Sequence, residues 1–413
     1  MGALGNLPEL PTDLTYIALL FALFVVPKAL LRYRIPDAVT CLLLGFAAVS
    51  LGFEHGNPTV EILSTFGITA LFLFAGLEID AHELRRGART LVQHAIIWSA
   101  LVVAVSVLLI RVLGLEWRPA ALASLALLTP STGFILSSLR SLGLAPAEQF
   151  SVKTKAVGSE LIALAALFFI MQTTSWQRFG IATGAMILIV AFIPFAFRLF
   201  ATRISPWAPR SEFAFLLMVA VVCAYATRQL GVYYLVGAFL VGVAAQRFRT
   251  QLPAMSSERM VDALEAFGSV FIPFYFFAAG THIAHDQITW VSAAVGLGLV
   301  LVAVPLRVLV VEGHRRVALD EAPAASRRVA VALVPTLVFT LVLSNLLTHT
   351  FGAPPWLVGA LIIYTVVNTA LPAFVLRASA AEYSEPVAEA AGGAGVTTPS
   401  RTPPTSEAAP PAT

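Results

Sequence analysis

The sequence predicts an all-α polytopic membrane protein with thirteen transmembrane helices, built as inverted repeats with two crossed broken helices. Three observations lead to this prediction. Of the 413 residues, 58% are hydrophobic and 12% are charged, with a mean hydropathy of +0.85. Apolar runs long enough to cross a bilayer follow one another along the chain. A Lys and Arg bias alternates from one loop to the next. This composition excludes a soluble enzyme.

The predicted spans are apolar runs of about 17–25 residues bounded by charge, Pro or Gly. Their limits are Leu14–Leu31, Pro36–Gly52, Val60–Ile79, Thr90–Leu113, Pro119–Leu139, Lys155–Thr173, Phe179–Phe200, Ser211–Gln229, Tyr233–Gln246, Leu264–Ile283, Thr289–Glu312, Arg328–Leu347 and Trp356–Leu376.

Basic residues predict the orientation, because loops rich in Lys and Arg stay on the cytoplasmic side. They gather after every odd-numbered span up to the eleventh, whereas the alternate loops are poor in them. We therefore predict an N-terminus outside and a cytoplasmic C-terminus, in a bacterial inner membrane. The basic sets are Lys28, Arg32 and Arg34; Arg85, Arg86 and Arg89; Arg140, Lys153 and Lys155; Arg198, Arg203 and Arg210; Arg247, Arg249 and Arg259; Arg315, Arg316, Arg327 and Arg328.

The chain divides into a membrane domain, residues 1–379, and a tail, residues 380–413. The tail is rich in Ala, Pro, Ser, Thr and Glu, a composition that favours disorder in the cytoplasm. Cys41 and Cys223 both lie in apolar runs, and no Cys or His pattern predicts a metal or another cofactor. The basic residues lie between spans, so they predict contact with membrane lipid and not with nucleic acid.

Two spans carry a proline near a cluster of hydroxyl side chains. The fifth contains Thr129, Pro130, Ser131, Thr132 and Gly133, and the twelfth contains Pro335 and Thr336. Proline removes a backbone hydrogen bond, so each helix is expected to break there, although a simple kink is the other interpretation. Because these spans run in opposite directions, the pair predicts an inverted-repeat transporter with its binding site between the breaks.

Glu160 is a lone carboxylate inside the sixth span. Ionisable residues in a spanning segment usually face the bundle interior and serve function, so Glu160 is the candidate functional group. A satisfied structural carboxylate is the alternative. Arg307 in the eleventh span has a similar depth, and the two side chains are predicted to meet unless Arg307 extends to the inner interface. His94, His282, His285 and His349 lie near span ends and are predicted to be interfacial.

Several segments resemble the cation/proton antiporter superfamily, especially its Kef and sodium/proton exchanger branch. The resemblance covers nearly the whole membrane part in order. It is carried by Leu31-Arg-Tyr-Arg-Ile-Pro-Asp37 followed by Leu43-Leu-Gly45, by Ala70-Leu-Phe-Leu-Phe-Ala-Gly-Leu-Glu-Ile-Asp80 with Leu84-Arg-Arg86, by Gly237-Ala-Phe-Leu-Val-Gly242, and by Pro273-Phe-Tyr-Phe-Phe-Ala-Ala-Gly280.

The resemblance implies a homodimer in which a core, about residues 90–173 and 289–376, moves against a dimerisation scaffold. It implies that Glu160 is the ion-binding acid with Ser159 as its neighbour, and that Arg307 takes the place of the family's basic core residue. Thr129, Ser131 and Thr132 would complete the ion site. Ser159 and Glu160 depart from the family's usual residues in this motif, as does the twelfth span, which lacks a Gly-Glu-Phe or Arg-Gly-Glu pattern.

The predicted function is exchange of protons for a monovalent cation, sodium or potassium, by alternating access at Glu160. A single deep carboxylate, with Ser159 in place of a second acid, predicts electroneutral exchange. The residues leave two other functions open. One is sodium-coupled uptake of an organic anion, since broken helices present their N-termini to carboxylates. The other is a non-transporting membrane scaffold or sensor.

Overall fold

The computed structural model describes residues 12–53, 56–79, 85, 87–139, 141–172, 175–208, 211–229, 235–249 and 258–376. The predicted tail and Tyr233, where the ninth span was predicted to begin, lie outside these residues. The described helices are α1 (Thr12–Leu31), α2 (Asp37–Ser50), α3 (Pro58–Leu77), α5 (Ala88–Leu113), α6 (Trp117–Leu128), α7 (Thr132–Ser138), α8 (Pro146–Gln172), α9 (Trp176–Leu199), η1 (Phe200–Ile204), α10 (Glu212–Gln229), α11 (Leu235–Arg249), α12 (Glu258–Thr281), η3 (His285–Gln287), α13 (Trp290–Leu319), α14 (Pro323–Ala332), α15 (Leu337–Phe351) and α16 (Pro355–Val375).

The all-helical membrane fold is confirmed over the described ranges. Each predicted segment coincides with one helix, or with two helices separated by a break. By length and apolarity, nine described segments can cross a membrane, one of which runs from α6 into α7, and the bent pair α14 and α15 makes a tenth. The apolar parts of α1, α2 and α11 are shorter, 10–17 residues each. The count of thirteen crossings therefore stays a prediction.

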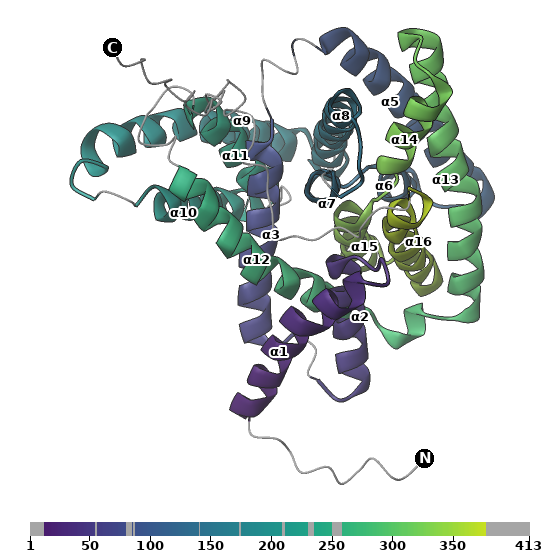
Figure 1. The fold of residues 1–413 in the computed structure, drawn as a ribbon, viewed down its shortest axis with the longest axis horizontal. Helices are drawn as coiled ribbons and strands as arrows, with labels where there is room; N and C mark the ends of the chain where they lie inside the picture. The colour runs from purple at the N-terminus through teal and green to yellow at the C-terminus, as the bar shows by residue number, and fades with distance from the viewer. Residues whose placement is uncertain are drawn as a thin grey trace, which may run out of the picture.

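The helices pack in two groups (Figure 1). In what we call the α3 group, α3 packs against α10, α11 and α12, and α12 also covers α2. In what we call the crossing group, α6 packs against α5 and α15, and α13 packs against α14 and α16. To this group also belongs α8, which packs against α5, α7 and α14. The groups meet where α7 contacts α3 and where α16 contacts α2. Long α13 forms one outer edge of the crossing group in Figure 1.

Local sequence sets the helix ends that matter for the site. The Asn57 side chain accepts hydrogen bonds from the N–H groups of Thr59 and Val60, so α3 begins at Pro58 with Glu61 in its first turn. Thr289 and Ser292 form a capping box at the start of α13. Gly352 ends α15 in the left-handed conformation, at a φ of 58°.

Small residues bring the backbones of the α3 group together. A Cβ atom on Gly242 of α11 would lie 2.2 Å from the carbonyl oxygen of Leu73 on α3, and one on Gly76 would lie 2.2 Å from that of Phe239. Small residues allow such close approach between helices in membranes. The obstacle is backbone on both sides, so neither helix can accept a side chain without moving.

We expect Gly242→Ala to destabilise the protein by about 1–3 kcal/mol, the usual cost of overpacking. Thermal unfolding in detergent would measure the change. Gly298→Ala in α13 is the matched control, because a Cβ there meets nothing within 4 Å. Equal unfolding temperatures for the two variants would contradict this account of the α3–α11 contact.

Candidate functional site at the crossing of two broken helices

Two helix interruptions meet in the middle of the crossing group. Residues 129–131 separate α6 from α7, with Thr129 and Ser131 in extended conformation. Residues 333–336 separate α14 from α15, and the chain bends there by 43°. The Ser131 N–H donates to the Pro335 carbonyl at 2.8 Å, so the two breaks touch through their backbones. Pro130 and Pro335 lie in the breaks, Thr336 precedes α15, and Gly133 lies in α7.

Side chains bind the carbonyl oxygens left free at the end of α6. Thr340 Oγ1 donates to Ala126 O at 2.7 Å, and the Tyr364 hydroxyl donates to Leu127 O at 2.7 Å. Trp98 Nε1 donates to Leu128 O at 3.4 Å. A helix end buried in a membrane protein needs such partners, because no water or lipid group can replace them.

Arg307 satisfies the end of α14 in the same way. Its guanidinium donates to Val334 O at 2.6 Å, to Leu333 O at 2.8 Å and to the Tyr364 hydroxyl at 3.2 Å. The side chain is buried, so it does not extend to the interface. The predicted meeting with Glu160 is not seen: no ion pair joins the two among the described residues. A charged donor at a helix C-terminus is favoured because the helix dipole is negative there.

A polar cluster surrounds Thr336 at the start of α15. Asn368 Oδ1 accepts from Thr336 N at 3.3 Å, and Asn368 Nδ2 donates to Thr336 Oγ1 at 3.0 Å. Thr365 Oγ1 lies 3.0 Å from the same hydroxyl, and Thr340 Oγ1 lies 2.8 Å from it. The sequence interpretation missed Asn368 and Tyr364. Both could have been found from the sequence as polar side chains in the middle of the last apolar segment.

Glu160 lies beside the first break and is only 3% exposed. Its Oε2 accepts a hydrogen bond from the Thr132 N–H at 3.2 Å, in the first turn of α7. Thr129 Oγ1 is also buried, and no hydrogen-bond partner for it occurs among the residues described. The structure thus brings Glu160, Thr132 and the backbone of the break together, with oxygen atoms suited to a hard monovalent cation.

Ser159 is buried beside Glu160 and pairs with a histidine. Its Oγ lies 2.9 Å from His94 Nε2. Both side chains, with Pro130 and Arg307, line a small cavity of about 30 Å³. Arg307 therefore lies near Ser159 without pairing with Glu160. The prediction that His94 is interfacial is wrong, because α5 turns it into the crossing group, where it is 5% exposed.

A second polar pair lies about one helical turn before Ser159 in α8. Lys155 was assigned to a charged loop, yet its side chain is buried and its Nζ lies 2.9 Å from His314 Nδ1. His314 Nε2 faces Gln93 Oε1 at 3.4 Å. Lys155 Nζ carries hydrogens to donate, so the tautomer of His314 with a lone pair on Nδ1 fits this contact. Loop charge alone could not predict that Lys155 is buried against His314, because Lys155 lies at the boundary between loop and span.

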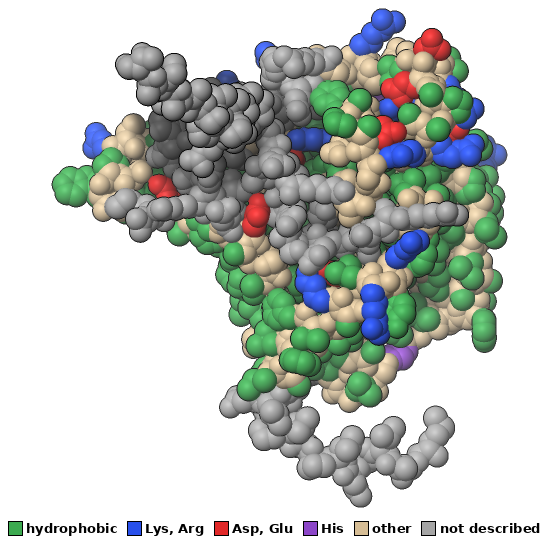
Figure 2. All heavy atoms as spheres, viewed as in Figure 1, with side chains coloured by type: hydrophobic (Ala, Val, Ile, Leu, Met, Phe, Trp, Pro, Cys, Tyr) green, Lys and Arg blue, Asp and Glu red, His purple; other side chains and the backbone are tan. Residues whose placement is uncertain are grey.

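Charged residues gather at one end of the molecule, which we call the Lys153 face. Lys153 Nζ lies 2.9 Å from Glu78 Oε2, which joins α8 to the end of α3. Arg328 pairs with Glu148 at 3.3 Å. Figure 2 shows further charged side chains of both signs at the top right, over the ends of α13 and α14. There Arg315 pairs with Glu321, and Arg316 and Arg327 pair with Glu312.

A cavity of about 690 Å³ opens at the opposite end, which we call the His349 face. It lies between the α3 group and the crossing group, lined by α3, α10 and α12 on one side and by α15 and α16 on the other. Thr69 and Leu341 are among its lining residues. Leu71 lies about 3 Å beyond Thr69 along α3 by helical rise, and it packs against Gly133 in α7. Glu160 does not line this cavity.

Comparison with known proteins decides the family. The family described as "Sodium/hydrogen exchanger, transmembrane" matches residues 17–378. This chain belongs to the sodium/hydrogen exchanger family. It is a family of transporters and not of enzymes, so the prediction that the chain is not an enzyme is confirmed, as is the resemblance to cation/proton antiporters.

Individual relatives are distant. The chain is 24% identical over 251 residues to the probable Na(+)/H(+) antiporter GerT of Bacillus cereus, covering 58% of this chain and 64% of that relative. It thus spans less than two-thirds of GerT's length. It is 23% identical over 285 residues to the probable Na(+)/H(+) antiporter 3 of Methanocaldococcus jannaschii, covering 64% and 70%. The solved sodium proton antiporter MjNhaP1 of that organism shares the fold, with a TM-score of 0.61 at 15% identity over 88% of this chain and 95% of MjNhaP1.

The grouping of possible metal ligands can be checked over the described residues. Over the described part of the chain, no group of three or more His, Cys, Asp and Glu residues could hold a metal ion. At the crossing, the carboxylate of Glu160 lies against the backbone of Thr132. A buried carboxylate can be neutralised either by a proton or by a small cation.

Proposed function

We propose that this member of the sodium/hydrogen exchanger family exchanges protons for sodium or potassium, one for one, by alternating access at Glu160. The observation that carries the proposal is the buried Glu160 carboxylate, held against the Thr132 N–H where two broken helices touch. Ser159, Thr129, Ser131 and Thr132 supply further oxygen ligands. Because the proton and the cation compete for one negative charge, each cycle moves no net charge.

The first test is transport by purified protein in liposomes. A pH-sensitive dye inside the vesicles would follow proton movement after sodium, potassium or lithium is added in turn. Cation-driven proton flux that is unaffected by clamping the membrane potential supports electroneutral exchange. Absence of flux with every cation would refute the exchanger function, and a cation-dependent current would refute the one-for-one stoichiometry.

The charge bias supports an orientation for the molecule. We place the Lys153 face in the cytoplasm and the His349 face outside the bacterial inner membrane, in accord with the positive-inside rule. The large cavity then faces outward, while the Lys153–Glu78 ion pair closes the cytoplasmic side between the two helix groups. In this proposal the crossing group is the moving core, the α3 group is the scaffold, and two scaffolds form a homodimer. Cross-linking in native membranes would test the dimer.

Breaking the Lys153–Glu78 pair is expected to shift the protein toward a cytoplasm-facing state. The pair joins α8 to α3 across the two groups, at 26% and 18% side-chain exposure, so it favours the outward-facing arrangement. In a background lacking Cys41 and Cys223, a cysteine at Ser344, which lines the cavity, would report outside access to an impermeant thiol reagent. Glu78→Gln should slow the labelling of this cysteine about twofold to fivefold, because the lost ion pair stabilises the outward-facing state by up to about 1 kcal/mol.

Lys153→Arg, which keeps the pair, is the control for this change. Its labelling should match the wild-type rate. If Glu78→Gln and Lys153→Arg are labelled equally fast, the pair does not hold the cytoplasmic side closed.

A further inference from the structure

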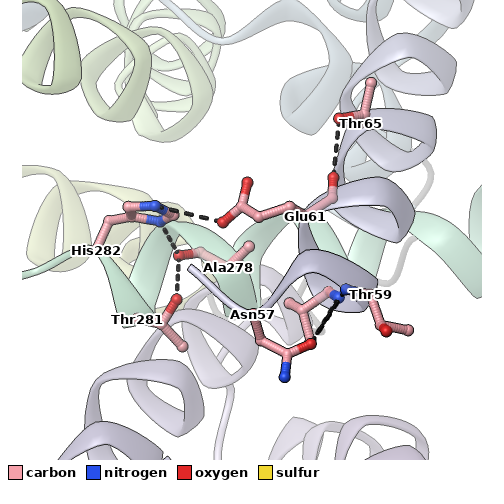
Figure 3. Close-up of polar contacts among 8 residues, drawn as sticks. Asn57, Thr59, Glu61, Thr65, Ala278, Thr281 and His282 are labelled. Atoms are coloured by element: carbon pink, nitrogen blue, oxygen red, sulfur yellow. Dashed lines mark hydrogen bonds and ion pairs between the residues drawn. The ribbon is translucent and has the colours of Figure 1, made fainter. Parts of the chain in front are cut away.

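Glu61 and His282 both line the large cavity, at the His349 face. Their side chains point toward each other (Figure 3). Glu61 belongs to the first turn of α3, and His282 directly follows α12. His282 Nε2 lies 3.3 Å from Glu61 Oε1, with both side chains about two-fifths exposed, at 40% and 41%. Both belong to the α3 group, so their contact does not depend on movement of the crossing group.

The hydrogen-bond pattern fixes how many protons this contact holds. His282 Nδ1 lies 2.8 Å from the Ala278 carbonyl oxygen, which can only accept, so Nδ1 carries a hydrogen. The other ring nitrogen faces a carboxylate oxygen. If His282 were neutral, its Nε2 lone pair would point at the negative charge of Glu61. The contact is favourable only when a second proton lies on the ring or between the two groups.

The charges around this pair make its proton count important for the cavity. Among the described residues that line the cavity, Glu61 is the one carboxylate, with Arg228 of α10, His282 and His349 of α15 as the basic groups. With a proton on the pair, the carboxylate is neutralised by the imidazolium. Without it, Glu61 is a free negative charge at the mouth, where the α3 dipole also favours an anion.

We propose that Glu61 and His282 form a proton-binding site that sets the electrostatic potential of the outer cavity and thereby the access of external cations. External protons occupy the pair and weaken the attraction for cations. Loss of the proton exposes the Glu61 charge, which concentrates hydrated cations in the cavity through water, without coordinating them. This site is separate from Glu160, and its effect on transport rests on the proposed exchange function.

Transport kinetics at varied external pH test the proposal. In liposomes of uniform orientation, Glu61→Gln should raise the apparent KM for external sodium about twofold to threefold at alkaline pH. This is the effect expected when one negative charge that acts through water is removed. The difference should shrink at high salt, and it should disappear over the pH range in which the wild-type pair holds its proton while His282 of the variant does not. The maximal rate should not change.

Two changes at His282 separate charge from packing. His282→Arg is permanently charged and should show the raised KM at every pH. His282→Gln is never charged and should keep the low KM in acid. A Glu61→Gln effect of the same size at every pH, with no range in which it disappears, or a His282→Arg KM equal to wild type in alkali, would overturn the proposal.

A second measurement does not require transport. Nitrogen NMR of the seven histidines should show one ring with both nitrogens protonated that disappears in His282→Gln and loses a proton in Glu61→Gln. If the liposomes show no exchange but this signal is present, the proposed function fails while the proton site stands. If exchange occurs and the signal is unchanged by Glu61→Gln, the proton site fails alone.

Discussion

Glu160→Gln is expected to reduce cation-driven proton flux to the level of empty liposomes. Glutamine has nearly the same shape, and its amide oxygen can still accept from the Thr132 N–H that now binds Glu160 Oε2 at 3.2 Å. It carries no negative charge, so it can neither take up a proton nor compensate a bound cation. Folding should survive while exchange is lost, which unfolding temperature and flux measured on the same preparation would show.

Two controls make this result specific to the crossing. Glu160→Asp keeps the carboxylate and should retain measurable exchange with altered cation affinity. Glu148→Gln removes another carboxylate of α8, one that pairs with Arg328 at the Lys153 face, and should leave exchange largely intact. Flux that persists in Glu160→Gln, with sodium or with potassium, would rule out this carboxylate as the exchange site.

Competition at Glu160 also has a definite sign with pH. A proton on the carboxylate excludes the cation, so acidification on the side that Glu160 faces should weaken apparent cation affinity, at most about tenfold per pH unit for a single group. The maximal rate at saturating cation should change much less. The Glu160→Asp variant should keep this dependence, displaced along the pH axis.

Arg307→Met should destabilise the protein more than any other single change considered, by roughly 3–5 kcal/mol. The substitution removes donors from the buried carbonyls of Leu333 and Val334, and each unsatisfied buried group costs about 1–3 kcal/mol. Exchange should be lost with it, because these bonds fix the end of α14 at the break. Thermal unfolding in detergent, with flux from the surviving folded fraction, would measure both effects.

Arg307→Lys separates positive charge from geometry. One ammonium cannot reproduce the fork that binds two carbonyls and the Tyr364 hydroxyl, so an intermediate loss of stability is expected. Arg316→Met is the matched control, since this side chain is 42% exposed and its partner Glu312 keeps its ion pair with Arg327. Wild-type stability of Arg307→Met would mean that the carbonyls of the second break find other partners.

Much of the fold followed from local sequence. Apolar length predicted the helices, and prolines at 130 and 335 predicted where two of them are interrupted, because a proline removes a backbone donor wherever the chain goes. The burial of Glu160 followed for a similar reason: a carboxylate in an apolar run is costly at the lipid face, so it was expected to face the bundle interior, as it does. The matched family confirmed the exchanger fold that these features and the resemblance predicted.

Side-chain partners did not follow in the same way. Arg307 was expected to approach Glu160, since both have similar depth, but depth gives no information about direction around a helix axis. Arg307 instead donates to the free carbonyls of Leu333 and Val334. His94 was placed at an interface by its position near a span end, whereas the packing of α5 directs it to Ser159.

The sequence by itself determined which segments form apolar helices, where two of them break and which carboxylate lies in the apolar run beside the first break, because hydropathy, proline geometry and charge cost are local properties. Only the tertiary structure decided that Ser131 meets Pro335, that Arg307 serves the second break, and that Glu61 meets His282. Hydrogen bonds require atoms about 3 Å apart with defined directions. That placement arises from the packing of helices distant in sequence, and no pattern along one helix specifies it.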